Sequence, residues 1–182
     1  VDGEKGCYAS HIQAWRQLLA SDAPALVVLE DDVVLEEAFA PVVQAIAALE
    51  GDWDMVKLMG RPAGEKIRAA RPLTPTHRLI QYRRVPSFTA GYMVSRAGAR
   101  KLLDSRVPFG RPIDIDLRFW WENGLRILGV QPPVVRLDVT SQDSTIAGRG
   151  TPARWATRWR KLAMKARLTW GNARHLRTQK GL

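Results

Sequence analysis

Three consecutive acids, Glu30, Asp31 and Asp32, interrupt the otherwise apolar stretch ALVVLEDDVVL at residues 25–35. Burying unpaired charge is costly, so these carboxylates need solvent or a partner. In an extended chain alternate side chains share a face, which predicts that Glu30 and Asp32 lie together and that Asp31 points the other way. Two carboxylates on one side repel each other unless a cation lies between them. Mg²⁺ and Mn²⁺ take oxygen ligands and keep positions open for phosphate oxygens, so the pattern predicts a metal site facing a diphosphate.

The same acids have a simpler interpretation as a solvated turn that caps a following helix. A second acidic element, PIDID at residues 112–116, raises the same two alternatives. Asp114 and Asp116 alternate with isoleucine, so both face one way if the segment is extended. A helix is predicted directly after them, and Asp116 is the better candidate for its cap.

Helices and strands alternate along the chain, which predicts an α/β fold with a mixed, mostly parallel sheet flanked by helices. The run 25–29 is continuously apolar, as in a parallel strand that is buried on both faces. Open α/β sheets bind ligands beyond the carboxyl ends of their strands, and the acidic triplet lies at such an end. A loop is predicted over 61–76, and a β-hairpin or sheet edge is predicted around Pro86. The predicted helices are 5–20, 36–50, one that begins after Ser95 as its N-cap, and one from Pro112 to Gly124; the predicted strands are 25–29, 54–59, 78–85, 87–94 and 126–137.

Four blocks, GCYASHIQAW, LVVLEDDVVL, FTAGYMVSRAGARKLL and PIDIDL, follow one another within residues 1–145. Together they resemble the glycosyltransferase family 25 enzymes, the lipooligosaccharide galactosyltransferases of bacteria, which are related to the collagen galactosyltransferases. The resemblance implies a GT-A-type fold, a UDP-sugar donor (usually UDP-galactose), a divalent metal (Mn²⁺ or Mg²⁺) and transfer with inversion. The implied acceptor is a hydroxyl of a lipooligosaccharide or lipopolysaccharide core, or of a related glycan.

The resemblance also assigns roles to residues at the matching positions. Asp32, with Glu30, corresponds to the metal-binding acids. Inversion requires a base that takes the proton of the acceptor hydroxyl, and Asp114 or Asp116 is the candidate catalytic base. The expected residues of the donor and nucleotide pocket are Ser10, His11, Glu30, Asp31, Gly91 and Tyr92.

Each of these assignments has a structural alternative. His11 is equally interpretable as a hydrogen-bonded helix histidine, Gly91 as a packing glycine and Tyr92 as a core aromatic. Cys7 is interpreted as a small core residue. Asp143 and Ser144 are weak candidates for a segment that closes the site. Arginines that can bind phosphate, but that are expected on the solvated surface, are Arg61, Arg83 and Arg84.

Family members normally begin with a strand that carries an Asn-Leu-Asp-type motif and with an Arg-bearing helix, some tens of residues before the Val-Asp-Gly found here at residues 1–3. Residues 1–147 are therefore expected to be a glycosyltransferase domain that is incomplete at its N-terminus. The alternative is a non-catalytic, membrane-associated binding module that kept the fold and lost the donor pocket.

The net charge of +10 comes entirely from the last 35 residues. Residues 1–147 contain 18 Lys/Arg and 18 Asp/Glu, whereas 148–182 contain 10 Lys/Arg and no acid. Within residues 152–170 the apolar side chains fall near one helical face and basic ones fill the others, which predicts a membrane-surface helix. A helix packed on the domain with a solvated basic face is the alternative. Nucleic acid is not expected, because the tryptophans segregate from the basic face. That apolar face consists of Trp155, Trp159, Leu162, Ala166 and Trp170.

A single cysteine, Cys7, excludes an internal disulfide and fits a reducing compartment. The sequence contains no run of 18 apolar residues and no recognisable signal peptide. We therefore expect a cytoplasmic protein that is peripheral at the inner membrane face.

Overall fold

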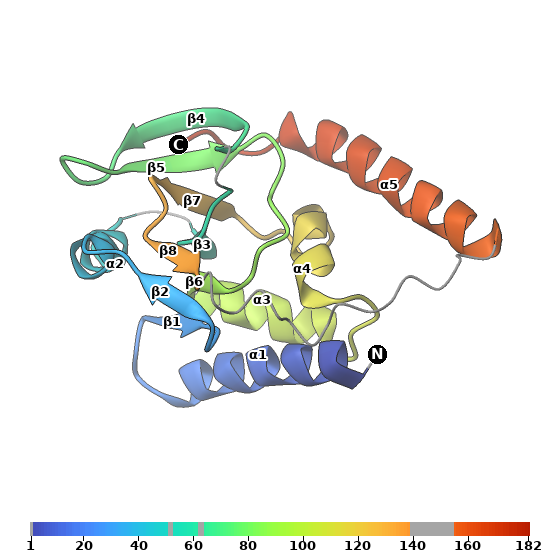
Figure 1. The fold of residues 1–182 in the computed structure, drawn as a ribbon, viewed down its shortest axis with the longest axis horizontal. Coiled ribbons are helices and arrows are strands. Elements are labelled where there is room, and N and C mark those ends of the chain that lie inside the picture. The colour runs from blue at the N-terminus through green and yellow to red at the C-terminus, as the bar shows by residue number, and fades with distance from the viewer. Residues whose placement is uncertain (1, 51–52, 62–63, 139–154) are drawn as a thin grey trace.

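The computed structural model describes residues 2–50, 53–61, 64–138 and 155–182. Within them a six-stranded mixed sheet lies between helical layers, beside a small two-stranded sheet (Figure 1). The helices are α1 Asp2–Ala20, α2 Phe39–Ala47, α3 Arg96–Arg106, α4 Ile113–Asp116, the 3₁₀-helix η1 Leu117–Glu122 and α5 Trp155–Leu176. The strands are β1 Ala25–Leu29, β2 Val33–Leu35, β3 Met55–Lys57, β4 Ile67–Pro72, β5 Arg78–Tyr82, β6 Gly91–Ser95, β7 Ile127–Gln131 and β8 Val135–Leu137.

The strand order in the large sheet is β1-β6-β3-β7-β5-β4. Among the described strands of that sheet, only β3 and β7 pair in parallel. The prediction of an α/β fold with a mixed sheet is confirmed, whereas the prediction that most strands are parallel is wrong. The reason is that β6 returns between β1 and β3 and runs antiparallel to both, while β4 and β5 add a hairpin at the other edge.

Strand β1 coincides with the predicted strand 25–29, but its surroundings differ from the prediction. It is an edge strand, and it pairs antiparallel with β6. The apolar run was expected to reflect a strand inside a parallel sheet, but the structure gives another reason for it. Leu26 and Val28 pack against the core beneath α1, and Ala25 and Val27 pack against the core beneath α2. Both faces of this edge strand are therefore covered, so polar alternation is absent.

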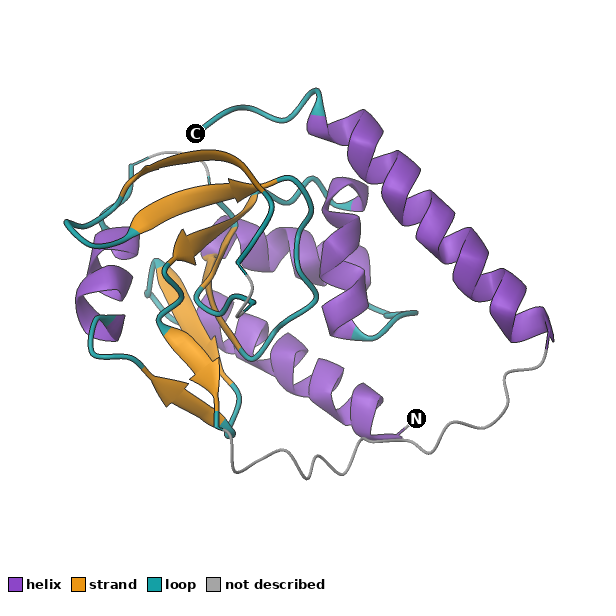
Figure 2. Cartoon of the chain, turned by 45° about the horizontal axis from the view of Figure 1, so that its top comes forward, coloured by secondary structure: helices purple, strands orange, loops and turns teal. Residues whose placement is uncertain are grey.

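Two hydrophobic cores lie on opposite faces of the sheet. Tyr8, Trp15 and Leu18 of α1 belong to the first core, together with residues of α3, α4 and η1. Val42 and Ile46 of α2 belong to the second. Figure 2 shows α1 and α3 on one side of the strands and α2 on the other. The helical spacing that predicted α1 is thus the spacing of its buried residues.

Local sequence signals set several element boundaries. The Ser95 hydroxyl accepts a hydrogen bond from the Gly98 amide at 3.1 Å, which confirms the predicted N-cap of α3. Gly124 has a φ of +61°, and it ends the segment that η1 occupies. Pro41 lies in the first turn of α2, where its missing amide hydrogen costs little.

The prediction of a loop over 61–76 is wrong for residues 67–72, which form β4. This strand pairs with β5, so the hairpin turn lies between β4 and β5. The hairpin expected around Pro86 does not form, because β6 pairs with β1 and β3, and β5 pairs with β4 and β7. The failure of the hairpin around Pro86 comes from pairing with strands far away in the sequence, which the local pattern does not indicate.

Helix α5 confirms the predicted C-terminal helix, and its second half packs on the domain. Trp120 Nε1 donates to Asn172 Oδ1 at 3.1 Å, and the Trp121 and His175 rings stack at 5.9 Å between centroids. The opposite face leaves Trp159 and Trp170 more than two-thirds exposed. Among the described residues, no helix is both long and apolar enough to cross a bilayer.

Candidate functional site

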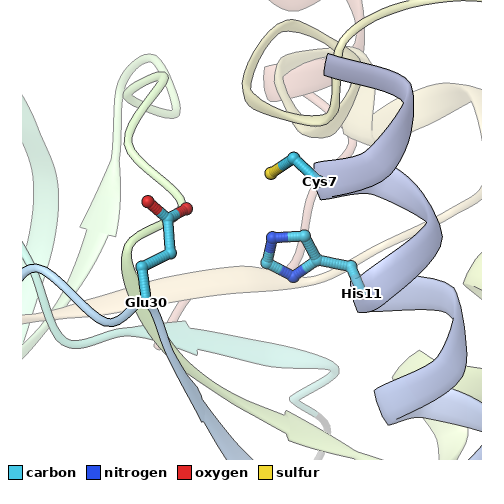
Figure 3. A group of neighbouring side chains, drawn as sticks. All are labelled: Cys7, His11 and Glu30. Atoms are coloured by element: carbon cyan, nitrogen blue, oxygen red, sulfur yellow. The ribbon is translucent and has the colours of Figure 1, made fainter. Parts of the chain in front are cut away.

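Helix α1 brings Cys7 and His11 to the end of β1 where the acidic triplet begins. The two residues are four apart, so they lie one turn apart on the same face of the helix. Glu30 directly follows β1, and its amide donates to the Ala90 carbonyl at 2.9 Å. Figure 3 shows the Glu30 carboxylate turned toward the Cys7 thiol and the His11 ring. One ligand atom from each of these three residues lies within 4.8 Å of the others.

His11 is held from behind by two aromatic residues. The His11 Nδ1 atom lies 2.8 Å from the Tyr92 hydroxyl, which also accepts a hydrogen bond from Trp15 Nε1 at 2.9 Å. The His11 side chain is buried, and burial lowers its pKa to about 4, so the ring is neutral at neutral pH. The contact with Tyr92 holds the Nδ1 edge of the ring, and the opposite Nε2 edge faces Cys7 and Glu30 (Figure 3).

Tyr92 is a core residue of β6 and supports His11. Burial is the main cause that raises its pKa, and only 1% of the residue is exposed. The structure therefore fits the alternative given for Tyr92, a core aromatic, and its place in the donor pocket stays a prediction. Gly91 also has a packing explanation, since an added Cβ would lie 2.9 Å from Val135 Cγ1.

Asp31 and Asp32 lie in a turn, so the extended chain on which the predicted alternation depends ends at Glu30. Glu30 and Asp32 are partly buried, and Asp31 is exposed. Burial and the charge of Asp32 raise the pKa of Glu30, while a hydrogen bond from Thr89 Oγ1 at 3.3 Å opposes that rise. Asp32 Oδ1 is buried without a hydrogen-bond partner among the described residues. Two neighbouring carboxylates, one with an unsatisfied buried oxygen, fit a bound cation.

Asp114 of α4 is an electrostatic neighbour of Cys7 and Glu30, whereas Asp116 binds other partners. The charge of Asp114 contributes to raising the pKa of both Cys7 and Glu30, after burial and nearer groups. Asp116 instead binds Arg106 Nε at 2.8 Å and Arg111 Nε at 2.9 Å. The expectation that both acids share one face is wrong, because residues 113–116 form a helical turn, in which side chains two apart diverge.

Asp116 also accepts a hydrogen bond from the Tyr8 hydroxyl at 2.7 Å, and it is 3% exposed. Both of its oxygens are thus occupied by structural partners. This arrangement accounts for Asp116 as the ion-pair anchor of α4, and it leaves Asp114 as the candidate base.

An arginine cluster, which comprises Arg61, Arg84 and Arg118, lies beside Asp114. Burial and the charges of Arg84 and Arg61 lower the pKa of Arg118, whereas Asp114 raises it. The Nε atoms of Arg84 and Arg118 are buried without a hydrogen-bond partner in the part of the chain that the structure describes. Repelling guanidinium groups with unsatisfied donors form a candidate site for phosphate.

Lys57, the last residue of β3, is a further functional candidate that the sequence analysis did not identify. Its Nζ donates to the Pro86 carbonyl at 2.7 Å and to the Phe88 carbonyl. Burial lowers the pKa of Lys57 to about 7. These bonds fix the segment that leads to Thr89, the hydrogen-bond donor to Glu30. Arg118 was also missed, although its position one turn after Asp114 was a usable signal.

The remaining candidates lie apart from this cluster or outside the described residues. The Ser10 hydroxyl donates to the Gly6 carbonyl at 3.1 Å on the exposed side of α1. Asp143 and Ser144 fall outside the residues that the structure describes. A cavity of about 760 Å³ contains none of the predicted site residues, and it is lined mainly by residues of the loops before β3 and β7, of α3 and of the C-terminal segment, among them Trp53, Ser95, Lys101, Trp121 and Gln179.

The family model for glycosyltransferase family 25, described as an LPS biosynthesis protein, matches residues 1–117. The chain belongs to this family. The match contains α1, the acidic triplet, β6 and Asp114, so the gathered residues all come from the family region, with Arg118 directly after it. The resemblance recognised in the four sequence blocks is confirmed.

Two kinds of curated family 25 protein resemble the chain to a similar degree. Procollagen galactosyltransferase 1-B of Xenopus laevis is 32% identical over 120 residues, which are 63% of this chain and 19% of that protein. A probable inactive glycosyltransferase 25 family member 3 of Rattus norvegicus is 30% identical over 118 residues, 63% of this chain and 20% of that protein. Procollagen galactosyltransferase 2 of Homo sapiens is 27% identical over 118 residues, 63% of this chain and 18% of that protein. The matches thus span about a fifth of the length of these relatives.

Proposed function

We propose that this family 25 chain transfers a hexose, galactose, from a UDP-sugar to a hydroxyl of a lipooligosaccharide or lipopolysaccharide core or of a related glycan. The observation that carries the proposal is the approach of opposite charges around Asp114. Asp114 acts electrostatically on Glu30, whose repulsion with Asp32 calls for a cation. Asp114 also acts on Arg118 of the arginine cluster, whose repulsion calls for an anion. A metal-bound sugar diphosphate supplies both.

The acidic side of the site would hold a divalent ion, Mg²⁺ or Mn²⁺, through Asp32 and Glu30. Such an ion neutralises charge that develops on the leaving diphosphate. The guanidinium groups of Arg84 and Arg118 would bind phosphate oxygens through their unsatisfied donors. Lys57 would keep residues 86–88 in place, and through them Thr89, which orients the Glu30 carboxylate.

Asp114 is the proposed base. Attack by the acceptor hydroxyl on the anomeric carbon breaks the bond from that carbon to the diphosphate, and the hydroxyl proton passes to the Asp114 carboxylate. One displacement of this kind inverts the configuration at the anomeric carbon. Asp116 is not proposed for this step, because its oxygens already bind Arg106, Arg111 and Tyr8.

A lipid-linked acceptor is supported by the free face of α5. Trp159, Leu162 and Trp170 are exposed there, opposite the side that packs on the domain, and Arg174 and Lys165 flank them. Tryptophan on an apolar stripe between basic residues suits an anionic bilayer surface. We propose that α5 lies on the cytoplasmic leaflet and holds the enzyme beside its acceptor.

A non-catalytic, membrane-associated binding module is the second candidate. It is favoured by one observation: proteins described as inactive family members match this chain as well as procollagen galactosyltransferases do. In that case the acidic and arginine groups would bind a ligand without turnover. The two candidates share the charged site and differ in whether the donor bond is broken.

Release of UDP from UDP-galactose by the full chain, with and without a lipooligosaccharide core acceptor, separates the candidates. We expect turnover that EDTA abolishes and that Mn²⁺ restores. Asp32→Asn should lower the rate at least about 100-fold through loss of a metal ligand, whereas Asp22→Asn, in an exposed turn, is the matched control. Calorimetric binding of UDP without turnover would establish the binding module, and unaltered turnover in EDTA or in Asp32→Asn would overturn the metal role.

A further inference from the structure

Three side chains with chemically different donors converge at the junction of α1 and β1. They are the Cys7 thiol, the His11 imidazole and the Glu30 carboxylate (Figure 3). One donor atom from each lies within 4.8 Å of the other two. The carboxylate pair of the proposed donor site uses Glu30 and Asp32 and leaves Cys7 and His11 without a role. Their position therefore needs a separate explanation.

The spacing of the three donor atoms is close to that of a metal centre. Bond lengths of about 2.0–2.3 Å and tetrahedral angles separate neighbouring ligand atoms by about 3.5 Å. The donor atoms already lie within 4.8 Å of one another, about 1.3 Å above that spacing at most. Cys7 and His11 stand one turn apart on a single rigid helix, so the Glu30 side chain is the only member that must approach from another element.

Supporting hydrogen bonds hold two of the three ligands from behind. The His11 Nδ1 atom lies 2.8 Å from the Tyr92 hydroxyl, and in the tautomer whose Nδ1–H donates to this hydroxyl the Nε2 atom binds the ion. Thr89 Oγ1 donates to Glu30 Oε1 at 3.3 Å. A ligating histidine whose second nitrogen is fixed by a hydrogen bond, and a ligating carboxylate that is itself hydrogen-bonded, are the usual surroundings of a protein-bound metal.

We propose that Cys7, His11 and Glu30 bind a divalent ion of the zinc class. Sulfur and imidazole ligands favour Zn²⁺ or Co²⁺ over Mg²⁺, which prefers oxygen. On binding, the thiol loses its proton to solvent, so that the thiolate and the carboxylate balance the two charges of the ion. Three protein ligands leave one tetrahedral position open for water or for a substrate oxygen.

This site shares Glu30 with the carboxylate pair of the proposed function but takes a different ion, and its binding is measured without any sugar donor. Zinc binding can therefore fail while transfer is observed, and the reverse is equally possible. Cys7 is the only cysteine of the chain, which makes a sulfur-specific signal unambiguous.

The test uses the full chain, freed of metal by dialysis against a chelator and titrated with Co²⁺. We expect one ion per chain, a near-ultraviolet sulfur-to-cobalt charge-transfer band and the intense visible bands of tetrahedral Co²⁺. Excess Zn²⁺ should remove these bands, and it should slow alkylation of Cys7 at least about tenfold. A cobalt complex that has no sulfur band, or equal alkylation rates with and without Zn²⁺, would overturn the proposal.

Variants separate this site from the carboxylate pair. Cys7→Ser should lower Zn²⁺ affinity at least about tenfold and change Mn²⁺ affinity by less than about twofold. His11→Gln should weaken Zn²⁺ binding similarly, and Glu36→Gln, an exposed carboxylate of the turn before α2, is the matched control. Equal Zn²⁺ affinity in Cys7→Ser and the unaltered chain would contradict the proposal, and the alkylation test decides the question if His11→Gln does not fold.

Discussion

Asp114 and Asp116, two residues apart in α4, serve opposite sides of that helix. Asp116 is buried against Arg106 and Arg111, with N–O distances of 2.8 and 2.9 Å. Asp114 is an electrostatic neighbour of Glu30 and Cys7. In this single helical turn, Asp116 therefore binds the arginines that hold α4 in place, and Asp114 lies toward the candidate site.

Substitution by asparagine should separate these roles. Asp114→Asn removes the proposed base and should lower transfer at least about 100-fold, with a smaller loss of unfolding free energy than Asp116→Asn. Asp116→Asn removes the negative charge that Arg106 and Arg111 share. It should therefore lower the unfolding free energy by about 3 kcal/mol. Rates of UDP release and urea denaturation curves check the two expectations. Equal stability losses in both variants would show that Asp114 is also an anchor.

The sequence indicated which residues belong to the candidate site better than it indicated how they are arranged. The triplet and PIDID were identified from local residue types, and GCYASH was identified from the family resemblance. The partition between Asp114 and Asp116 was not, because alternation was applied to a segment that folds as a helix. A short acidic segment does not indicate clearly whether it is extended or helical. Here Ile113 and Leu117 pack in the first core, together with the helical turn.

Lys57 and β4 illustrate what local patterns omit. A lysine in an apolar strand is acceptable only where distant groups satisfy it, and here those groups are the carbonyls of Pro86 and Phe88. Strand β4 exists because β5 pairs with it, although its own residues suggested a loop. By contrast, the N-cap at Ser95 involves only neighbouring residues, and it was predicted correctly.

Lys57 should make stability depend on pH above neutrality. Its folded pKa of about 7 lies below the unfolded value of 10.5, so the unfolded chain binds more protons between these values. The free energy of unfolding should therefore rise with pH across that window, by on the order of 3 kcal/mol for this group. A neutral amine keeps two N–H donors, and two carbonyls accept from this nitrogen, so its bonds survive deprotonation.

Lys57→Met isolates this contribution. Urea denaturation of both proteins from pH 7 to pH 10 measures their free energies of unfolding. With rising pH, the free energy of unfolding of the unaltered chain should increase relative to that of the variant. A constant difference over that range would mean that Lys57 keeps its charge in the folded state. Arg71→Met, on an exposed position of β4, controls for the loss of one positive charge.

Gly171 sets the contact between α5 and η1. A Cβ at this position would lie 2.5 Å from Trp121 Cζ2, well inside van der Waals contact. Gly171→Ala should weaken docking of α5 by about 1–3 kcal/mol, although alanine alone would favour the helix by about 1 kcal/mol. Hydrogen exchange at residues 168–176 should accelerate while exchange in β3 and β7 stays slow. Slower exchange in the variant would show that helix propensity outweighs the contact.

The free face of α5 should bind anionic bilayers through its tryptophans. Trp159 and Trp170 are 67% and 69% exposed, and insertion of each ring should contribute about tenfold in affinity. The double variant Trp159→Ala/Trp170→Ala should therefore sediment about 100-fold less tightly with phosphatidylglycerol-containing vesicles, and Thr169→Ala, exposed on the same helix, should not change. Binding should also weaken in neutral vesicles and at high salt, because basic residues flank the stripe. If the double variant instead changed the oligomeric state in ultracentrifugation and left vesicle binding intact, the face would be an interface between copies of the chain.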